Sequence, residues 1–429
     1  MRVFVESFGC STNLADGEVL AGCLAEAGYE LTKSSAEADI IVCNTCAVKG
    51  PTENRMIEIL KKVPADKKLI VAGCLPLINL ERLRREARFD GILGPAAGEK
   101  IVDAVRRVSN GERVLLLKES VKAKPSLGLP RLRLNSVSSI VPISYGCLGS
   151  CAYCCVIFAR GRLRSYRIHE VVERVKRDFA TGVREFWVTS QDTACYGRDV
   201  GTNLAELLHS LCGVEGCFKI RVGMMTPNMV TDILEDLIRA FRNDKVFKFV
   251  HLPVQSGDDQ ILKRMRRFYT TKEFKRLVDA FRASIPDITL STDAICGFPG
   301  ESREAFENTM RLIEEVKPDI VNVSKFFARP RTPAAEMRAN FVPLPEIKRR
   351  SSEAAKLAKC VAFERNQRWV GWTGEVLIDE VGKVSGSWVG RNFAYKPIAV
   401  KSSRELLGKN LRVKIVKALP NHLEGEIIE

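Results

Sequence analysis

The sequence predicts an α/β protein with three parts: an N-terminal parallel α/β domain, a central partial (β/α)6 barrel and a small C-terminal β-barrel. Apolar strand-like segments alternate with amphipathic helical segments over residues 1–110, and the alternation resumes over residues 136–370. From residue 371 to 429 the pattern changes to short strands separated by Gly and Asn turns. The 429 residues are enough for roughly two to four domains, each with its own core.

In the first domain we expect strands at RVFVESF, ADIIVCNT and KKLIVAG. Amphipathic helices should follow near residues 15–27, 51–63, 77–86 and 99–108, and Pro51 suits a first helical turn. Alternation of this kind predicts a parallel sheet covered on both faces. The polar residues 111–135 are interpreted as a linker that could form a hairpin.

The central domain has six strand candidates: SIVPIS, REFWVTS, FKIRVGM, FKFVHLP, DITLSTDAIC and DIVNVSKF. Helical patterns separate them, so we predict β/α units in a barrel, with the chemistry at the C-terminal ends of the strands. A basic helix near residues 346–370 closes this part. The strand candidates TGEVLIDEV, KPIAVKS, NLRVKIVKAL and LEGEII then predict a β-barrel of oligonucleotide-binding type.

The formal net charge of +15 favours a polyanionic partner, nucleic acid before membrane, although a merely soluble basic protein is the alternative. We expect no membrane association, because no apolar run approaches the roughly 20 residues of a membrane span. We expect no secretory signal, because a strand is predicted from residue 2. In the cytoplasmic location that this implies, 14 cysteines indicate metal ligation or redox chemistry before disulfides.

Cys147, Cys151 and Cys154 form a C-x3-C-x2-C motif directly after the first barrel strand. Three thiolates cannot saturate a cubane cluster of four irons, so the remaining iron would be open to a substrate or cofactor. A structural zinc site would need a fourth ligand nearby, and the adjacent Cys155 keeps that alternative open. We expect the open cluster, with Cys155 as a packing residue or a wall of the site.

A second set of cysteines follows the predicted N-terminal strands. Cys10, Cys46 and Cys74 each lie just beyond the carboxyl end of a strand, where parallel sheets bind ligands. They should therefore converge and could hold a second three-ligand iron–sulfur cluster. The alternative is that they are small buried hydrophobes, as free cysteines often are. Cys23 and Cys43 are interpreted as core residues.

The cysteine spacing, with Tyr153 just before the third cysteine, resembles the radical S-adenosylmethionine (SAM) superfamily. The resemblance implies that SAM chelates the open iron and is cleaved to a 5′-deoxyadenosyl radical that abstracts hydrogen. TSQDTACYG lies where this family binds the methionine end of SAM, and HLPVQSG and DAICGFPGES lie where it binds ribose and adenine. By position this assigns SAM contacts to Tyr153, Gln191, Asp192, Gln255, Ser256 and Gly297. The polar members of this set could instead cap helices or satisfy buried amides.

The resemblance extends to the methylthiotransferases. ESFGCSTNLADGEVLAGCL, ADIIVCNTCAVKGPTENR and VAGC look like their N-terminal domain, GCLGSCAYCCVIFARGRLRSY and CGFPGE look like their radical SAM domain, and the last barrel is similar to their RNA-binding TRAM domain. FARGRLRSY and QDTACYGRDVGTNLAELL are closest to the archaeal and eukaryotic branch, which methylthiolates N6-threonylcarbamoyladenosine beside the tRNA anticodon. This implies two 4Fe–4S clusters, sulfur held at the auxiliary one, and two SAM molecules per turnover, one as methyl donor and one as radical source.

Three departures from the family pattern stand out. Cys155 follows the third ligand directly, Gln191 stands where the branch often has an acidic residue, and we expect no membrane anchor because no apolar tail follows the barrel. Rival substrates are isopentenyladenosine in tRNA and a ribosomal-protein aspartate, and the rival class is a non-catalytic iron–sulfur RNA-binding protein. The sequence does not identify the electron donor or the sulfur source, and it leaves the oligomeric state open, with a monomer expected.

The basic residues fit a tRNA anticodon loop as partner. Phosphate contacts supply affinity, and an aromatic side chain such as Phe158 or Tyr166 could stack on a splayed base. The alternative is that most of the arginines form a solvated face. The candidate RNA contacts are Arg160, Arg162, Arg164, Arg167, Arg349 and Arg350.

Overall fold

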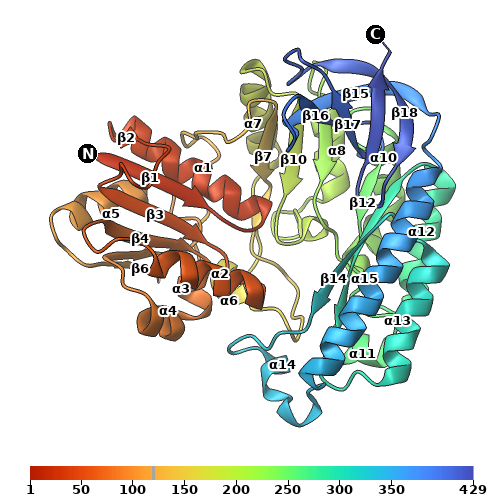
Figure 1. Ribbon diagram of the computed structural model, residues 1–429, viewed down its shortest axis with the longest axis horizontal. Coiled ribbons are helices and arrows are strands. Elements are labelled where there is room, and N and C mark those ends of the chain that lie inside the picture. Colours follow the sequence, from red (N-terminus) through yellow and green to blue (C-terminus); the bar gives the residue numbers. More distant parts are fainter. Residues whose placement is uncertain (118–120, 429) are drawn as a thin grey trace.

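The computed structural model describes residues 1–117 and 121–428, and its N-terminal domain is built on a six-stranded parallel sheet (Figure 1). The strand order is β2-β1-β3-β4-β5-β6. The central strands β3 and β4 are almost wholly buried, as expected for a parallel sheet with both faces covered. The strands are β1 (Arg2–Ser7), β2 (Glu30–Leu31), β3 (Ile40–Thr45), β4 (Lys68–Gly73), β5 (Gly91–Leu93) and β6 (Val114–Leu116).

Successive residues of β3 serve opposite faces of this sheet, as the strand period of two requires. Ile41 and Cys43 pack in one apolar cluster with helices α2 to α4, and Ile40 and Val42 pack in another with α1 and α5. The covered parallel sheet is thus confirmed, and Cys23 and Cys43 are core residues as predicted. The helices are α1 (Ser11–Glu26), α2 (Gly50–Lys61), α3 (Leu75–Ile78), α4 (Leu80–Glu86) and α5 (Lys100–Ser109).

Three details differ from the sequence-based expectation. The helix expected near residues 77–86 is two helices, α3 and α4, separated at Asn79, whose side chain caps α4. Helix α1 begins at Ser11 rather than near residue 15, because its first two turns bury polar Asn13 and Asp16, which an apolar period cannot reveal. The segment expected to be a linker or hairpin contains β6, which joins the first sheet by parallel pairing with β5. The expected hairpin also spans residues 118–120, which lie outside the described residues.

The central domain holds all six expected strands in parallel order. Sheets β11-β10-β7 and β12-β13-β14 are joined where Ile220 N donates to Lys245 O (2.7 Å) and Phe247 N donates to Ile220 O (2.9 Å). Within the described residues no strand pairing joins β7 to β14, so the barrel is partial. The strands are β7 (Ser138–Pro142), β10 (Glu185–Thr189), β11 (Lys219–Val222), β12 (Phe249–His251), β13 (Thr289–Cys296) and β14 (Ile320–Lys325), with a short pair β8 (Ser144–Tyr145) and β9 (Arg164–Ser165).

Helices cover the outside of this barrel (Figure 1). The long ones are α7 (Ile168–Ala180), α8 (Leu204–Cys212), α10 (Leu234–Arg242), α12 (Thr271–Ser284), α13 (Arg303–Val316) and the basic α15 (Leu344–Gln367). The short ones are α6 (Val156–Arg160), η1 (Thr193–Cys195), α9 (Pro227–Val230), η2 (Thr231–Ile233), α11 (Asp259–Arg264), α14 (Pro333–Glu336) and η3 (Arg338–Asn340).

The C-terminal part is a closed barrel of order β15-β16-β17-β19-β18, which confirms the small β-barrel. It docks on the central domain through a buried ion pair between Lys396 Nζ and Asp319 Oδ1 (2.8 Å). Within residues 1–117 and 121–428, none of the helices has the length and apolar character to cross a lipid bilayer. The strands are β15 (Thr373–Val381), β16 (Ser387–Arg391), β17 (Pro397–Lys401), β18 (Asn410–Ala418) and β19 (Leu423–Ile427).

Candidate active site with two cysteine sets

The first cysteine set lies in the loop between β8 and α6, directly beyond the first barrel strand. Gly149 N donates to Cys147 Sγ (3.1 Å), and a Cβ built on Gly149 would lie 3.3 Å from Cys147 Sγ and 3.7 Å from Cys151 Sγ. Burial raises the pKa of Cys154, and negative charge at Cys151 raises it further. The loop therefore gathers three thiols whose charges repel one another, a donor set that suits a cationic iron–sulfur cluster.

A buried cation lies against this set. Arg267 Nη1 donates to Cys151 Sγ (3.4 Å), and its remaining donors engage Pro253 O and the Tyr269 hydroxyl, each at 2.9 Å. Tyr153 stands beside it with its ring edge-on to Phe298, at 6.4 Å between centroids. In the sequence Arg267 is the last residue of the basic run KRMRR, and nothing in that run indicates that this arginine turns inward toward the thiols.

The loop after β10 brings a further thiol to the first set. Cys195 Sγ donates to Asp192 Oδ2 (3.2 Å). The pKa of Cys147 is lowered, chiefly by the adjacent Cys195 side chain. Ligand atoms of Cys147, Asp192 and Cys195 lie within 4.8 Å of one another. Sequence reasoning missed Cys195, although its place after a strand end is the same signal that found the other cysteines.

The polar residues assigned to SAM from this loop have local partners. Asp192 Oδ1 caps η1 by accepting from Ala194 N (3.2 Å) and also accepts from Thr226 N (3.1 Å). Gln191 Oε1 accepts from Gly146 N (2.6 Å), at the start of the cysteine loop. Both residues thus lie beside the first set, and both have the structural roles weighed as alternatives.

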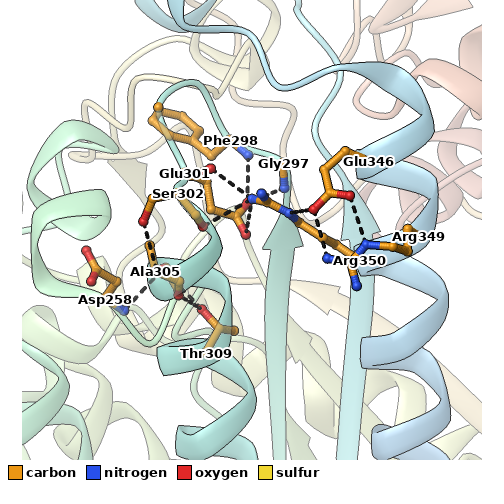
Figure 2. Close-up of polar contacts among 12 residues, drawn as sticks. Asp258, Gly297, Phe298, Glu301, Ser302, Ala305, Thr309, Glu346, Arg349 and Arg350 are labelled. Carbon is orange, nitrogen blue, oxygen red and sulfur yellow. Dashed lines mark hydrogen bonds and ion pairs between the residues drawn. The ribbon is translucent and has the colours of Figure 1, made fainter.

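The other assigned residues lie at the ends of the fourth and fifth barrel strands. Gln255 has φ of +74° and donates its N–H to Asp293 O (2.7 Å), while Ser256 Oγ accepts from Asp258 N (3.2 Å). Figure 2 shows Gly297 with its N–H bonded to the Glu301 carboxylate, whose side chain pairs with Arg350. Gly297 has φ of +78°, and a Cβ there would lie 2.4 Å from Ile347 Cγ1, so this turn requires glycine.

The second cysteine set converges at the edge of the N-terminal sheet. Cys10, Cys46 and Cys74 follow β1, β3 and β4, and Cys46 and Cys74 are buried. Gly9 has φ of +110°, and its Cβ would lie 2.5 Å from Cys46 Cβ, so only glycine lets the Cys10 loop approach this closely.

The thiols of this second set interact with one another. Burial raises the pKa of Cys74 to about 12, an effect that Arg160 opposes. Negative charge at Cys46 and Cys10 raises the Cys74 pKa further. The set can thus donate three thiolates to a cationic cluster, and the predicted convergence is observed.

Cys155 lies between the two sets, and negative charge on its thiol raises the pKa of both Cys46 and Cys154. It is buried in the apolar cluster that covers one face of the N-terminal sheet, with Sγ 3.9 Å from Ala47 O. It therefore packs against the N-terminal domain from the loop of the barrel, as the packing interpretation expected.

The arginines expected on an RNA-facing surface divide into two groups. Arg160 and Arg350 are buried and paired with Asp16 and with Glu301 and Glu346, so the expectation that they face phosphates is corrected. Asp16 and Glu301 are distant in sequence from the arginines they pair with, whereas Glu346 lies one turn before Arg350 on the same helix. These carboxylates allow the two arginines to be buried.

The other members of the basic set lie nearer to solvent. Arg162 and Arg167 are exposed, whereas Arg164 is half-buried and donates to main-chain oxygens. Arg349 pairs with Glu346 and Glu353 on its own helix. Of the two aromatic candidates, Tyr166 is buried with its hydroxyl bonded to Pro125 O, and half-buried Phe158 lies under Arg331 (4.4 Å).

A partial parallel barrel with three cysteines in the loop after its first strand defines a radical SAM protein. Sequence comparison agrees: residues 141–313 match the Radical SAM superfamily, residues 2–94 match the Uncharacterized protein family UPF0004, and residues 367–428 match the TRAM domain.

Full-length relatives identify the family. A relative from Pyrococcus horikoshii, named probable threonylcarbamoyladenosine tRNA methylthiotransferase, is 41% identical over 430 residues and both chains are covered completely. The human threonylcarbamoyladenosine tRNA methylthiotransferase is 36% identical over 435 residues, 99% of this chain and 74% of the human one. The chain belongs to the threonylcarbamoyladenosine tRNA methylthiotransferase family. Membership of the radical SAM superfamily brings a 4Fe–4S cluster and SAM as cofactors.

A solved structure shares the fold. The radical SAM methyltransferase TsrM from Kitasatospora setae superposes with a TM-score of 0.55 at 15% identity, covering 90% of this chain and 79% of TsrM. At this identity the likeness concerns the fold alone.

Proposed function

We propose that this protein converts N6-threonylcarbamoyladenosine, next to the anticodon of tRNA, to its 2-methylthio derivative. The observation that carries the proposal is the pairing of two separate three-cysteine sets, one in the first barrel loop and one at the N-terminal sheet edge. Helix α6 follows the first set in the chain and ends at Arg160, which interacts with the second set. Inserting sulfur at an unactivated C–H position requires both a hydrogen-abstracting site and a sulfur-holding site.

In this proposal Cys147, Cys151 and Cys154 hold the radical-generating cluster, and the second set, Cys10, Cys46 and Cys74, holds an auxiliary 4Fe–4S cluster. Each set leaves one iron without a protein ligand. Bound there, the first cluster with SAM would supply one-electron chemistry for hydrogen abstraction, and the second would supply a position for sulfur. One SAM molecule serves as radical source and another as methyl donor.

The chain's own residues fix and tune these sites. Arg267 offsets negative charge at Cys151, and the packed rings of Tyr153 and Phe298 exclude water from that side. Ser11, next to Cys10, shares a hydroxyl–hydroxyl hydrogen bond with Thr189 at the end of β10 (2.8 Å). This contact holds the second set against the barrel end where the first set lies.

Binding of tRNA rests on charge in this proposal. The net charge of +15 and the exposed Arg162 and Arg167 beside the cysteine loop supply phosphate contacts. The TRAM barrel adds a second surface for RNA. An electron donor and a sulfur source complete the reaction, which takes place in the cytoplasm where tRNA is modified.

The deciding experiment is nucleoside mass spectrometry of tRNA from cells with and without the protein. We expect loss of 2-methylthio-N6-threonylcarbamoyladenosine alone. A change confined to the isopentenyladenosine derivative, or no change in tRNA, would overturn the substrate assignment.

Variants separate the two cysteine sets in the same assay. Cys151→Ala should abolish 5′-deoxyadenosine formation and product, whereas Cys46→Ala should spare SAM cleavage and abolish methylthiolation. Cys217→Ala, at an exposed cysteine, is the matched control and should leave both unchanged. Loss of SAM cleavage in folded Cys46→Ala protein that is loaded at the first set would refute the division of roles.

A further inference from the structure

Arg160 is a fully buried charged side chain at the contact between the N-terminal domain and the barrel domain. It is 2% exposed and is among the largest fully buried side chains of the described chain. It belongs to the central domain, at the end of α6, yet its partners Asn13 and Asp16 lie on α1 of the N-terminal domain. Burying an arginine is costly unless its charge is matched, so its position calls for a physical reason.

The matching charge inside the protein is limited. Nη1 lies 2.6 Å from Asp16 Oδ2, and Nη2 donates to Asn13 Oδ1 (3.1 Å). Tyr145 donates its hydroxyl to the other oxygen of Asp16 (2.7 Å), which disperses part of that negative charge. Arg160 and Asp16 together are formally neutral. Arg160 can therefore stabilise a further anion only if some of its N–H donors are not already used.

Arg160 does have donors left over. Although Nη1 is close to Asp16, its N–H bonds do not point at that oxygen, and Nη1 and Asp16 Oδ2 are without hydrogen bonds among the described residues. Its partner Asn13 lies beside the second cysteine set, because a Cβ built on Gly9 would be 2.9 Å from Cys46 Sγ and 3.9 Å from Asn13 Cβ. The positive charge of Arg160 opposes the rise that burial causes in the pKa of Cys46 and of Cys74. A fully buried, underused cation therefore faces the second cysteine set.

Three cysteines without a bound cluster do not require such a cation, but three cysteines that hold an iron–sulfur cluster do. Three thiolates around a 4Fe–4S core that carries two positive charges leave about one negative charge, and an anionic sulfur ligand on the open iron adds another. Cys10 is exposed, but Cys46 and Cys74 are buried, and on their side of the site this excess negative charge needs a fixed positive partner. The five donors of an arginine suit an anion held next to a metal.

We propose that Arg160 is the anion-binding residue of the auxiliary site and holds a hydrosulfide-class ligand, an inorganic sulfide or a persulfide terminus, at its open position. This inference rests on the proposed second cluster. It makes the auxiliary site a composite one: three ligands come from the N-terminal domain, and the cation comes from the helix that follows the radical-site cysteines. Sulfur binding then depends on correct docking of the two domains.

The test uses the full chain with Cys147, Cys151 and Cys154 all changed to Ala, so that only the second set can bind a cluster. The protein is reconstituted anaerobically, iron is counted, and sodium hydrosulfide is titrated while the electron paramagnetic resonance spectrum of the reduced cluster is followed. Arg160→Gln should weaken hydrosulfide binding about tenfold to a hundredfold, as expected for loss of a charge-assisted hydrogen bond. Arg85→Gln, at an exposed arginine on α4 of the N-terminal domain, should bind hydrosulfide as tightly as the parent.

Two further variants guard against misfolding, because Arg160→Gln leaves Asp16 buried without its cation. The double variant Arg160→Gln/Asp16→Asn keeps the pocket neutral and should also lose hydrosulfide affinity while retaining about four irons. Asp16→Asn alone frees Arg160 from its carboxylate and should bind hydrosulfide at least as tightly as the parent.

The outcomes are distinguishable. Normal iron content with unchanged hydrosulfide affinity in both Arg160 variants overturns the role of Arg160 and leaves the second cluster intact. A folded parent with no iron at the second set overturns the auxiliary cluster itself, and the inference with it. Folded Arg160 variants that bind no iron show that Arg160 is needed for the cluster and not for its ligand, which also overturns the inference.

Discussion

The buried ion pair between Glu53 and Arg329 should control how firmly the N-terminal domain is held on the barrel. Glu53 lies on α2 and Arg329 lies in the segment after β14, and their side chains are 1% and 3% exposed. Glu53 Oε1 also accepts from Asn79 Nδ2 (2.8 Å) and from the more exposed Arg82 (3.0 Å). The perturbation is Arg329→Met, which keeps most of the volume and removes the charge.

The magnitude follows from burial. Removing one partner of a fully buried pair typically costs about 3–5 kcal/mol, because the other charge is left uncompensated. Arg82 still offsets part of the Glu53 charge, so we expect the lower end, about 3 kcal/mol. Adding Glu53→Gln to Arg329→Met should restore part of this loss, since no uncompensated carboxylate then remains.

The control lies on the same helix. Glu58 pairs with Lys61 at 3.0 Å, but the side chains of Lys61 and Glu58 are 40% and 63% exposed. Glu58→Gln should therefore change stability by no more than about 0.5 kcal/mol.

The assay is urea denaturation of the reduced protein, followed by circular dichroism. In activity assays Arg329→Met should retain SAM cleavage and lose methylthiolation, because the second cysteine set loses its fixed position against the barrel. If Arg329→Met is no less stable than Glu58→Gln, the reasoning from burial is refuted.

Three further predictions concern other parts of the chain. Burial raises the pKa of Glu185 from its usual 4.5 to about 8. Between these pH values the unfolded chain has lost this proton while the folded chain keeps it, so stability falls as pH rises. Glu185→Gln should flatten the fall of melting temperature with pH, and an unchanged slope would contradict this origin. Gly297→Ala would place a Cβ 2.4 Å from Ile347 Cγ1 at a residue with positive φ. It should lower the free energy of unfolding, measured by urea denaturation, by about 1–3 kcal/mol. An unchanged free energy of unfolding would mean that Ile347 and α15 can shift to accommodate the methyl group. Arg162→Gln and Arg167→Gln should each weaken tRNA binding and lower the steepness of its salt dependence by about one counterion, and a steepness equal to that of the unchanged protein would place them outside the RNA interface.

The sequence by itself determined the architecture and the positions of the candidate ligand thiols in it. Strand and helix periods are local properties, so the alternation of the first two domains and the closing β-barrel could be read directly. The same logic placed Cys10, Cys46 and Cys74 together, because carboxyl ends of parallel strands meet at one edge of a sheet. The C-x3-C-x2-C spacing is contained within one loop and needs no tertiary information.

Only the tertiary structure decided which charged and polar side chains turn inward. Arg160 and Arg162 stand two positions apart in one arginine-rich run, yet one is buried and the other exposed. The difference is made by Asn13, 147 residues from Arg160 in the chain, and by Asp16 on the same helix. The local sequence pattern cannot predict which arginine is buried when its partner carboxylate lies far away in the chain. The free energy of burying a cation depends on the carboxylates and thiols that the fold brings next to it.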